Sequence, residues 1–181
     1  IIWTTTKEDT DIYNGATAVN RIFKSGNYIY GLMTNTWPFT DNDTDEVWKV
    51  NANSGEIIWK QDFYVDIYRH NYLMNYDESS FLMGYFETTG VPKFAFLSKE
   101  NGDTISTHAI GFGNNLNFGL AVNSDLDICY SHRDSLYKVS GADPEEVIWS
   151  NALPSSDDIV DYLNIYIDPL DSIYLFSRFV D

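Results

Sequence analysis

The feature that most constrains this chain is a short pattern that recurs along it. Residues 47–59 read as a strand, a tight turn of Asn, Ser and Gly, and a second strand ending at Trp59. The pattern recurs with changes in residues 94–106 and 136–149, and its last part recurs in residues 1–3. Trp59 and Trp149 are 90 positions apart, or two units averaging 45. A period of roughly 40–50 residues built from short strands is typical of propeller blades.

Each unit also carries a pair of strands upstream of the repeated hairpin, separated by a turn rich in Asp, Asn, Ser or Gly. No segment shows a sustained period of 3.6 residues, so we expect little helix. The sequence therefore predicts an all-β protein, a β-propeller of four-stranded antiparallel blades. We place the end of a preceding blade at residues 1–10, three blades at 11–59, 60–106 and 107–150, and the front half of another at 151–181.

About three and a half blades do not close a ring, because propellers typically have four to eight. Open ends would leave strand edges unpaired, and such edges associate readily. We therefore expect either that these residues belong to a longer chain or that copies associate to complete the ring. The first alternative is favoured, because the segment begins and ends in mid-unit.

Charge and composition narrow the classes of partner. The formal net charge is −16, and phosphate backbones need clustered Lys and Arg, so nucleic acid is excluded as a partner. Anionic membrane surfaces are disfavoured for the same reason. No apolar run approaches the ~20 residues that span a bilayer. Aromatic residues make up 16% of the chain and suit interfaces, so we expect protein partners or self-association.

The repeated hairpins resemble the PQQ-like (quinoprotein) β-propeller repeat, whose consensus is approximately Ala-x-Asp-x-x-Thr-Gly-x-x-x-Trp. In the first copy Asn51, Ser54, Gly55 and Trp59 stand at the Asp, Thr, Gly and Trp positions. The second copy keeps Gly102 but has Ser106 in place of Trp, and the third keeps Trp149 but has one extra residue. The resemblance covers most of the chain. It implies a set of residues that lock adjacent blades, namely Trp3, Trp59, Trp149, Gly55 and Gly102.

The catalytic members of that family bind their quinone with further features, which include a stacking Trp, a Ca²⁺ site, a base Asp and commonly a Cys-Cys pair. This sequence has a single cysteine, and its tryptophans are accounted for at blade edges apart from Trp37. The resemblance therefore implies a non-catalytic member, not an enzyme, without a cofactor.

One acidic loop is a candidate for calcium binding. Asp41, Asp43 and Asp45 alternate in a segment that could present several oxygens to one Ca²⁺. It is not an EF-hand, because Glu46 and Ala52 replace the required Gly and Glu. A solvated polar loop is the favoured interpretation. The same segment holds the sequon Asn42-Asp43-Thr44, so Asn42 is a glycosylation candidate and a secreted or extracellular location is favoured.

Other chemistry-bearing residues fit structural roles better. Cys129 lies in an apolar stretch, and His132 three residues on falls on the opposite face of a strand, so we interpret Cys129 as a small buried residue. The adjacent Ser131, His132 and Asp134 cannot converge as a triad does.

Three functional hypotheses remain open. The leading one is a structural or protein-interaction propeller, extracellular or within a larger assembly. The second is a ligand-binding or PQQ-dependent propeller whose site residues lie in blades outside these residues. The third is a subunit of an extracellular filament whose open edges pair from copy to copy.

Overall fold

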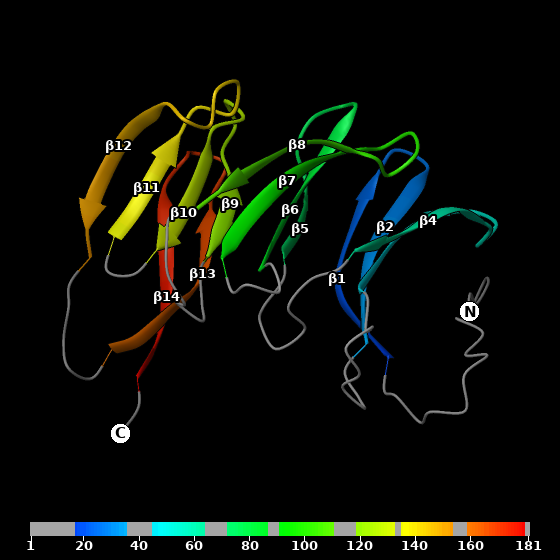
Figure 1. Cartoon of the computed structure of the whole chain (residues 1–181), viewed down its shortest axis with the longest axis horizontal. Helices are drawn as coiled ribbons and strands as arrows, with labels where there is room; N and C mark the ends of the chain where they lie inside the picture. The colour runs from blue at the N-terminus through cyan, green and yellow to red at the C-terminus, as the bar shows by residue number, and fades with distance from the viewer. Residues whose placement is uncertain are drawn as a thin grey trace. The chain divides into compact units, whose positions relative to one another are not determined.

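The computed structural model describes residues 17–35, 45–63, 72–86, 91–110, 119–132, 135–153 and 159–179. These residues form fourteen strands and no helix (Figure 1). The strands are β1 (Thr17–Ser25), β2 (Tyr28–Asn35), β3 (Asp45–Asn51), β4 (Ile57–Phe63), β5 (Tyr72–Asn75), β6 (Ser80–Phe86), β7 (Pro92–Ser98), β8 (Thr104–Ala109), β9 (Leu120–Val122), β10 (Ile128–His132), β11 (Ser135–Val139), β12 (Val147–Ala152), β13 (Ile159–Ile167) and β14 (Ile173–Phe179). With no helix in the described residues, none is long and apolar enough to cross a membrane.

Each sheet is built from strands that follow one another in the sequence. The first three sheets have four strands each, β1 to β4, β5 to β8 and β9 to β12, and the last pairs β13 with β14. Neighbouring strands whose register is described are antiparallel. The prediction of an all-β fold of four-stranded antiparallel sheets is confirmed.

The chain divides into two compact units. Unit 1 comprises residues 1–89 and 95–107, and unit 2 comprises residues 90–94 and 108–181. The core of unit 1 is built on Tyr30, Leu32, Val47, Leu73, Phe81, Met83, Ala95 and Leu97. The smaller core of unit 2 is built on Ala121, Leu136 and Ile165.

Burial changes from the third strand of a sheet to the fourth. All but the last residue of β3 are buried, whereas β4 alternates between exposed and half-buried residues. The same contrast separates β7 from β8. A strand covered on both faces needs a continuous apolar run, and a strand with one solvated face alternates. The fourth strand is therefore the outer strand of each four-stranded sheet.

The turn between the third and fourth strands is the same in the first two sheets. The amide of Gly55 donates to the carbonyl of Asn51, and the amide of Gly102 donates to the carbonyl of Ser98, each at 2.9 Å. Both glycines have positive φ, 77° and 80°, a conformation that costs other residues strain. The sequence pattern Asn/Ser-x-x-x-Gly thus encodes one turn geometry twice.

In the second, third and fourth sheets, the turn between the first and second strands is capped by a side-chain oxygen. Asp77 accepts backbone hydrogen bonds from Ser79 and Ser80, Asn123 accepts them from Asp125 and Asp127, and Asp168 accepts them from Leu170 and Ser172. Asn and Asp favour such turns because their short side chains can bond the backbone two to four residues on.

The expectation that the fourth strand ends at its tryptophan is wrong. β4 continues past Trp59 to Phe63, and β12 continues past Trp149 to Ala152. A register shift lies just before each tryptophan, because Val50 pairs with Ile57 while Lys49 pairs with Trp59. The shift recurs between Lys138 and Val139 in the third sheet. An extra residue of this kind is a β-bulge, which bends the strand and redirects the next side chain.

Candidate functional site

Trp59 of β4 lies against Gly102, which belongs to the turn after β7 in the next sheet. A Cβ atom built on Gly102 would lie 2.9 Å from Trp59 Cζ3, closer than such atoms approach one another. The ring also stacks on Phe81 of β6, with centroids 6.3 Å apart and planes 17° apart. Trp59 therefore packs against the neighbouring sheet of unit 1, on Phe81 of β6 and on Gly102 of the turn after β7.

The backbone carbonyl of Lys99 is the polar centre of this junction. It accepts a hydrogen bond from Lys49 Nζ at 2.6 Å, and longer ones of 3.4 Å from Tyr30 Oη and Trp59 Nε1. The three donors belong to β2, β3 and β4 and are direct cross-strand neighbours. One sheet thus presents a row of three donors to a single turn carbonyl of the next.

The side chain of Lys99 continues the junction in the opposite direction. Its ammonium donates to Asn75 Oδ1 at 2.6 Å, to Ser25 Oγ at 3.1 Å and to the carbonyl of Asp77. Only 6% of Lys99 is exposed, and burial lowers the pKa of its amine. A buried ammonium is tolerated because all its donors have acceptors.

Aromatic rings lie beside Lys49. Phe23 and Tyr30 stack at 5.0 Å, and Lys49 Nζ lies 4.3 Å from the centroid of the Tyr28 ring. Burial lowers the pKa of Lys49 and raises that of Tyr30 to about 12. The Tyr30 hydroxyl therefore stays protonated at neutral pH and acts as a donor.

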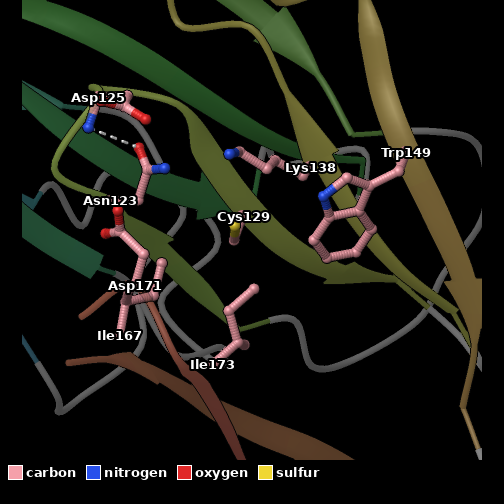
Figure 2. Close-up of a pocket in the computed structure, with 8 residues that line it drawn as sticks. All are labelled: Asn123, Asp125, Cys129, Lys138, Trp149, Ile167, Asp171 and Ile173. Carbon is pink, nitrogen blue, oxygen red and sulfur yellow. Dashed lines mark hydrogen bonds between the residues drawn. The ribbon is translucent and has the colours of Figure 1, made fainter.

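Unit 2 carries the same row of cross-strand neighbours. Cys129 pairs with Lys138, and Lys138 pairs with Trp149, as Tyr30 pairs with Lys49 and Lys49 with Trp59. Here the row borders a cavity of about 130 Å³ between β9–β12 and β13–β14. Figure 2 shows Lys138 and Trp149 on one side of this cavity, Ile167 and Ile173 on another, and Cys129 between them. Asn123, Asp125 and Asp171 complete the lining.

Lys138 is held at the cavity by an ion pair. Its Nζ lies 2.9 Å from Asp127 Oδ2, and this hydrogen bond raises the pKa of the lysine. Burial raises the pKa of the Cys129 thiol to about 11, so it is not a thiolate at neutral pH. The cavity therefore offers a cation and an indole donor beside apolar walls, and no activated nucleophile.

A polar contact also joins β13–β14 to the neighbouring sheet. Asp171 accepts from the amide of Ser124 at 3.1 Å and from its hydroxyl at 2.7 Å. These bonds lower the pKa of Asp171. The residue has φ of 60°, so the turn adopts a conformation that Asp tolerates better than most residues.

The predicted site residues are distributed as follows. Trp59 and Gly102 meet, Gly55 forms its own turn, and Trp149 borders the cavity. Asp45 is the first residue of β3 and is buried, so it lies on a strand and not in the expected loop. Trp3, Asp41, Asn42 and Asp43 lie outside the described residues. The calcium and glycosylation hypotheses therefore stay predictions, and the described ranges contain no cluster of three His, Cys, Asp or Glu able to hold a metal.

The sequence did not lead us to predict Lys49, Lys99 or Lys138 as site residues. Lys49 and Lys138 stand at the same position of the repeat, two residues before the turn, and this recurrence is a signal that could have identified them. Lys99 has no counterpart in the other copies, since Ala52 and Gly141 stand at its position. Only the folded structure places it at a junction.

Comparison with solved structures decides the architecture. The crystal structure of BamB from Moraxella catarrhalis, a β-propeller, matches with a TM-score of 0.51 over 87% of this chain and 48% of that one. This chain has a β-propeller fold. The identity is 14%, so the likeness shows the fold alone. The chain spans about half the length of BamB, no family pattern matches its sequence, and no curated protein matches it either.

Proposed function

We propose that this chain is part of a non-enzymatic propeller of the PQQ-like type that serves as a scaffold for protein partners. The observation that carries the proposal is an exposed aromatic face on β13–β14. Tyr166, Tyr174 and Phe176 are 54%, 49% and 56% exposed. Large aromatic side chains gathered on one sheet face are typical of protein interfaces, because they bury much area with few rotatable bonds.

Alternation along the two strands separates this face from the core. Ile165 is buried, and Ile167, Ile173 and Leu175 are partly buried on the inner face, where they pack in the core of unit 2. The aromatic residues alternate with them, so they point to the other side of the sheet. Tyr166 and Tyr174 are direct cross-strand partners, with ring centroids 6.0 Å apart. The sheet is therefore organised with an aliphatic side toward its own unit and an aromatic side toward solvent.

The acidic charge of the chain indicates what kind of partner surface it would bind. The chain has 27 acidic and 11 basic side chains, so a surface with an apolar centre and a basic rim is its natural complement. Opposite charges around an apolar contact increase the association rate and exclude acidic competitors.

The proposal is tested with two matched variants as affinity baits in an extract of the source organism. Phe176→Glu places a charge on the aromatic face, and Leu170→Glu places the same charge in the turn of that hairpin, where Leu170 is 87% exposed. We expect a protein captured by the wild type and by Leu170→Glu to be lost with Phe176→Glu. Once that protein is purified, its Kd should rise at least about tenfold for Phe176→Glu, an effect of about 1.4 kcal/mol.

Two results would contradict the proposal. The first is equal binding of the purified partner to both variants. The second is quinone-dependent oxidation of an alcohol or sugar by the chain in the presence of PQQ and Ca²⁺, because that would make it an enzyme.

A further inference from the structure

Asn101 is followed by Gly102 in the turn between β7 and β8, and this pair of residues can react without an enzyme. The amide nitrogen of a glycine can attack the side-chain amide carbon of the preceding asparagine, because glycine has no side chain to hinder the approach. Asn101 is exposed, so water can reach the product. The other Asn-Gly pair of the sequence, Asn14 and Gly15, lies outside the described residues.

The side-chain amide of Asn101 is held over the peptide with which it would react. Its Oδ1 accepts from the amide of Asp103 at 3.2 Å, and its Nδ2 donates to Asp103 Oδ2 at 2.5 Å. The side chain therefore folds back along its own backbone across Gly102, as in an Asx turn. This conformation brings the amide carbon toward the glycine nitrogen before the reaction begins.

The corresponding turn of the first sheet provides a comparison inside the same chain. There Asn51 accepts from the amide of Asn53 at 2.9 Å, so its side chain folds back in the same way. The next residue is Ala52, whose Cβ atom hinders attack by the backbone nitrogen. Ser54 stands at the position of Asn101 and has no amide to lose. Only the second of the two turns therefore combines the side-chain conformation with a following glycine.

The packing of Trp59 restrains the reaction. The amide of Gly102 donates to the carbonyl of Ser98 at 2.9 Å, and this bond must break before the nitrogen can attack. Trp59 lies against Gly102 and helps to hold the turn closed. The reaction rate therefore depends on how often this turn opens locally.

We propose that Asn101 is a site of spontaneous deamidation and that its modification weakens the contact between the first two sheets. The Gly102 nitrogen loses its proton to solvent base and forms a bond to Asn101 Cγ. The bond from Cγ to Nδ2 then breaks, and the nitrogen leaves as ammonia after taking up a proton. Water opens the resulting succinimide, at Cγ to give aspartate or at the main-chain carbonyl carbon to give isoaspartate. This inference does not rest on the proposed function.

Isoaspartate disturbs the contacts that this turn makes. It adds a carbon atom to the main chain and places a carboxylate beside Glu100 and Asp103, where like charges repel. The longer main chain displaces Gly102 from the Trp59 ring. It also displaces the carbonyl of Lys99, which accepts hydrogen bonds from three donors of the first sheet. The turn therefore loses both its packing and its polar contacts.

The first test ages the 181-residue chain in mildly alkaline buffer made with heavy-oxygen water and follows each asparagine by peptide mass spectrometry. We expect Asn101 to take up labelled oxygen at least about tenfold faster than Asn51, which corresponds to a barrier lower by about 1.4 kcal/mol. Methylation by a protein isoaspartyl methyltransferase should detect isoaspartate at position 101. Trp59→Ala should raise the rate at Asn101, whereas Trp149→Ala, in unit 2, should leave it unchanged.

The second test compares the thermal unfolding of fresh and aged chains. We expect the aged wild type to melt about 5 °C lower, the shift that loss of a few hydrogen bonds causes in a chain of this length. Asn101→Gln keeps an amide but must close a larger ring to react, so its melting temperature should not change on ageing. The proposal is overturned by equal conversion of Asn101 and Asn51, or by conversion that leaves the melting temperature unchanged. An equal fall for Asn101→Gln also overturns it, because another asparagine would then be responsible.

Discussion

Trp59 occupies the space that the missing side chain of Gly102 leaves open, with 2.9 Å between its Cζ3 atom and the position of a glycine Cβ. The contact joins residues 43 positions apart and connects the outer strand of one sheet to the third-strand turn of the next. A conformational requirement and a packing requirement coincide at Gly102, since its φ is also positive.

These two requirements can be separated with a pair of glycine substitutions. In Gly102→Ala the alanine has a strained positive φ, and its methyl group overlaps the Trp59 ring. In Gly26→Ala the φ of 58° is also strained, but nothing lies within 4 Å of the new methyl group. We expect Gly26→Ala to lower the free energy of unfolding by about 1 kcal/mol, the cost of strain alone. Gly102→Ala should lower it by about 3 kcal/mol, because overpacking adds to that cost. Urea unfolding measures the loss in free energy for both variants. Equal losses would show that the Trp59 ring moves aside at no cost.

The two repeat tryptophans should differ in their effect on stability. Trp59→Ala removes a ring that packs on Phe81 and Gly102, and we expect it to cost about 3 kcal/mol. Trp149→Ala should cost less, because that ring borders a cavity of about 130 Å³ and loses fewer contacts. Thermal unfolding of the two variants gives the comparison. If neither variant shifted the melting temperature, the blade-locking role of the tryptophans would be wrong.

The Lys99 ammonium is expected to stabilise unit 1. Lys99→Met keeps the aliphatic stem and removes three hydrogen bonds, to Ser25, Asn75 and Asp77, so we expect a loss of about 2 kcal/mol. Lys24→Met is the control, because that side chain is exposed and should change stability by less than about 0.5 kcal/mol. Matching urea midpoints for the two variants would show that desolvation of the ammonium cancels its bonds.

Acid should weaken the turn that Asp77 caps. Burial raises the pKa of this carboxyl. The hydrogen bonds from Ser80 and Ser79 together lower the pKa by more than burial raises it, so it lies below its ordinary value of 3.8. A lowered pKa means that the unfolded chain takes up the proton first. The stabilisation is therefore present above the unfolded pKa and lost as pH falls through the folded one. Asp77→Asn keeps an acceptor without titrating, so its stability should fall less steeply below about pH 4 than that of the wild type.

The control for the acid experiment is Glu78→Gln, which removes an exposed carboxylate from the same turn. This variant keeps Asp77 and its hydrogen bonds from Ser79 and Ser80, so we expect it to retain the acid weakening assigned to the cap. The same acid slope for Asp77→Asn and wild type would exclude a contribution from the cap.

Cys129 should react slowly with thiol reagents in the folded chain. Burial raises its pKa from 9.0 to about 11, so at pH 8 the thiolate is about a hundredfold scarcer than in the unfolded chain. Alkylation by iodoacetamide, followed by mass spectrometry with and without urea, measures the ratio. Equal rates in the two states would show that the thiol is neither buried nor shifted.

Local features of the fold were accessible from the sequence because they depend on a few adjacent residues. The positive φ of Gly55 and Gly102 follows from the Asn/Ser-x-x-x-Gly pattern of each hairpin. The bulge before Trp59 and Trp149 was not predicted, because the same letters read equally well as a regular strand. The prediction of where the fourth strands end was wrong for a related reason. The partners on the third strand determine where pairing stops, and the aromatic residue does not.

The sequence by itself determined the repeat, the strand-turn-strand units and the all-β class, since periodicity and turn chemistry act within about ten residues. The tertiary structure alone decided that Lys49, Tyr30 and Trp59 converge on the carbonyl of Lys99. It also decided that the equivalent row in unit 2 borders a cavity. A backbone carbonyl is present at every residue, so no sequence pattern marks the one that packing brings to three donors. Which residues meet between sheets depends on how the sheets pack, and that is a property of the folded chain.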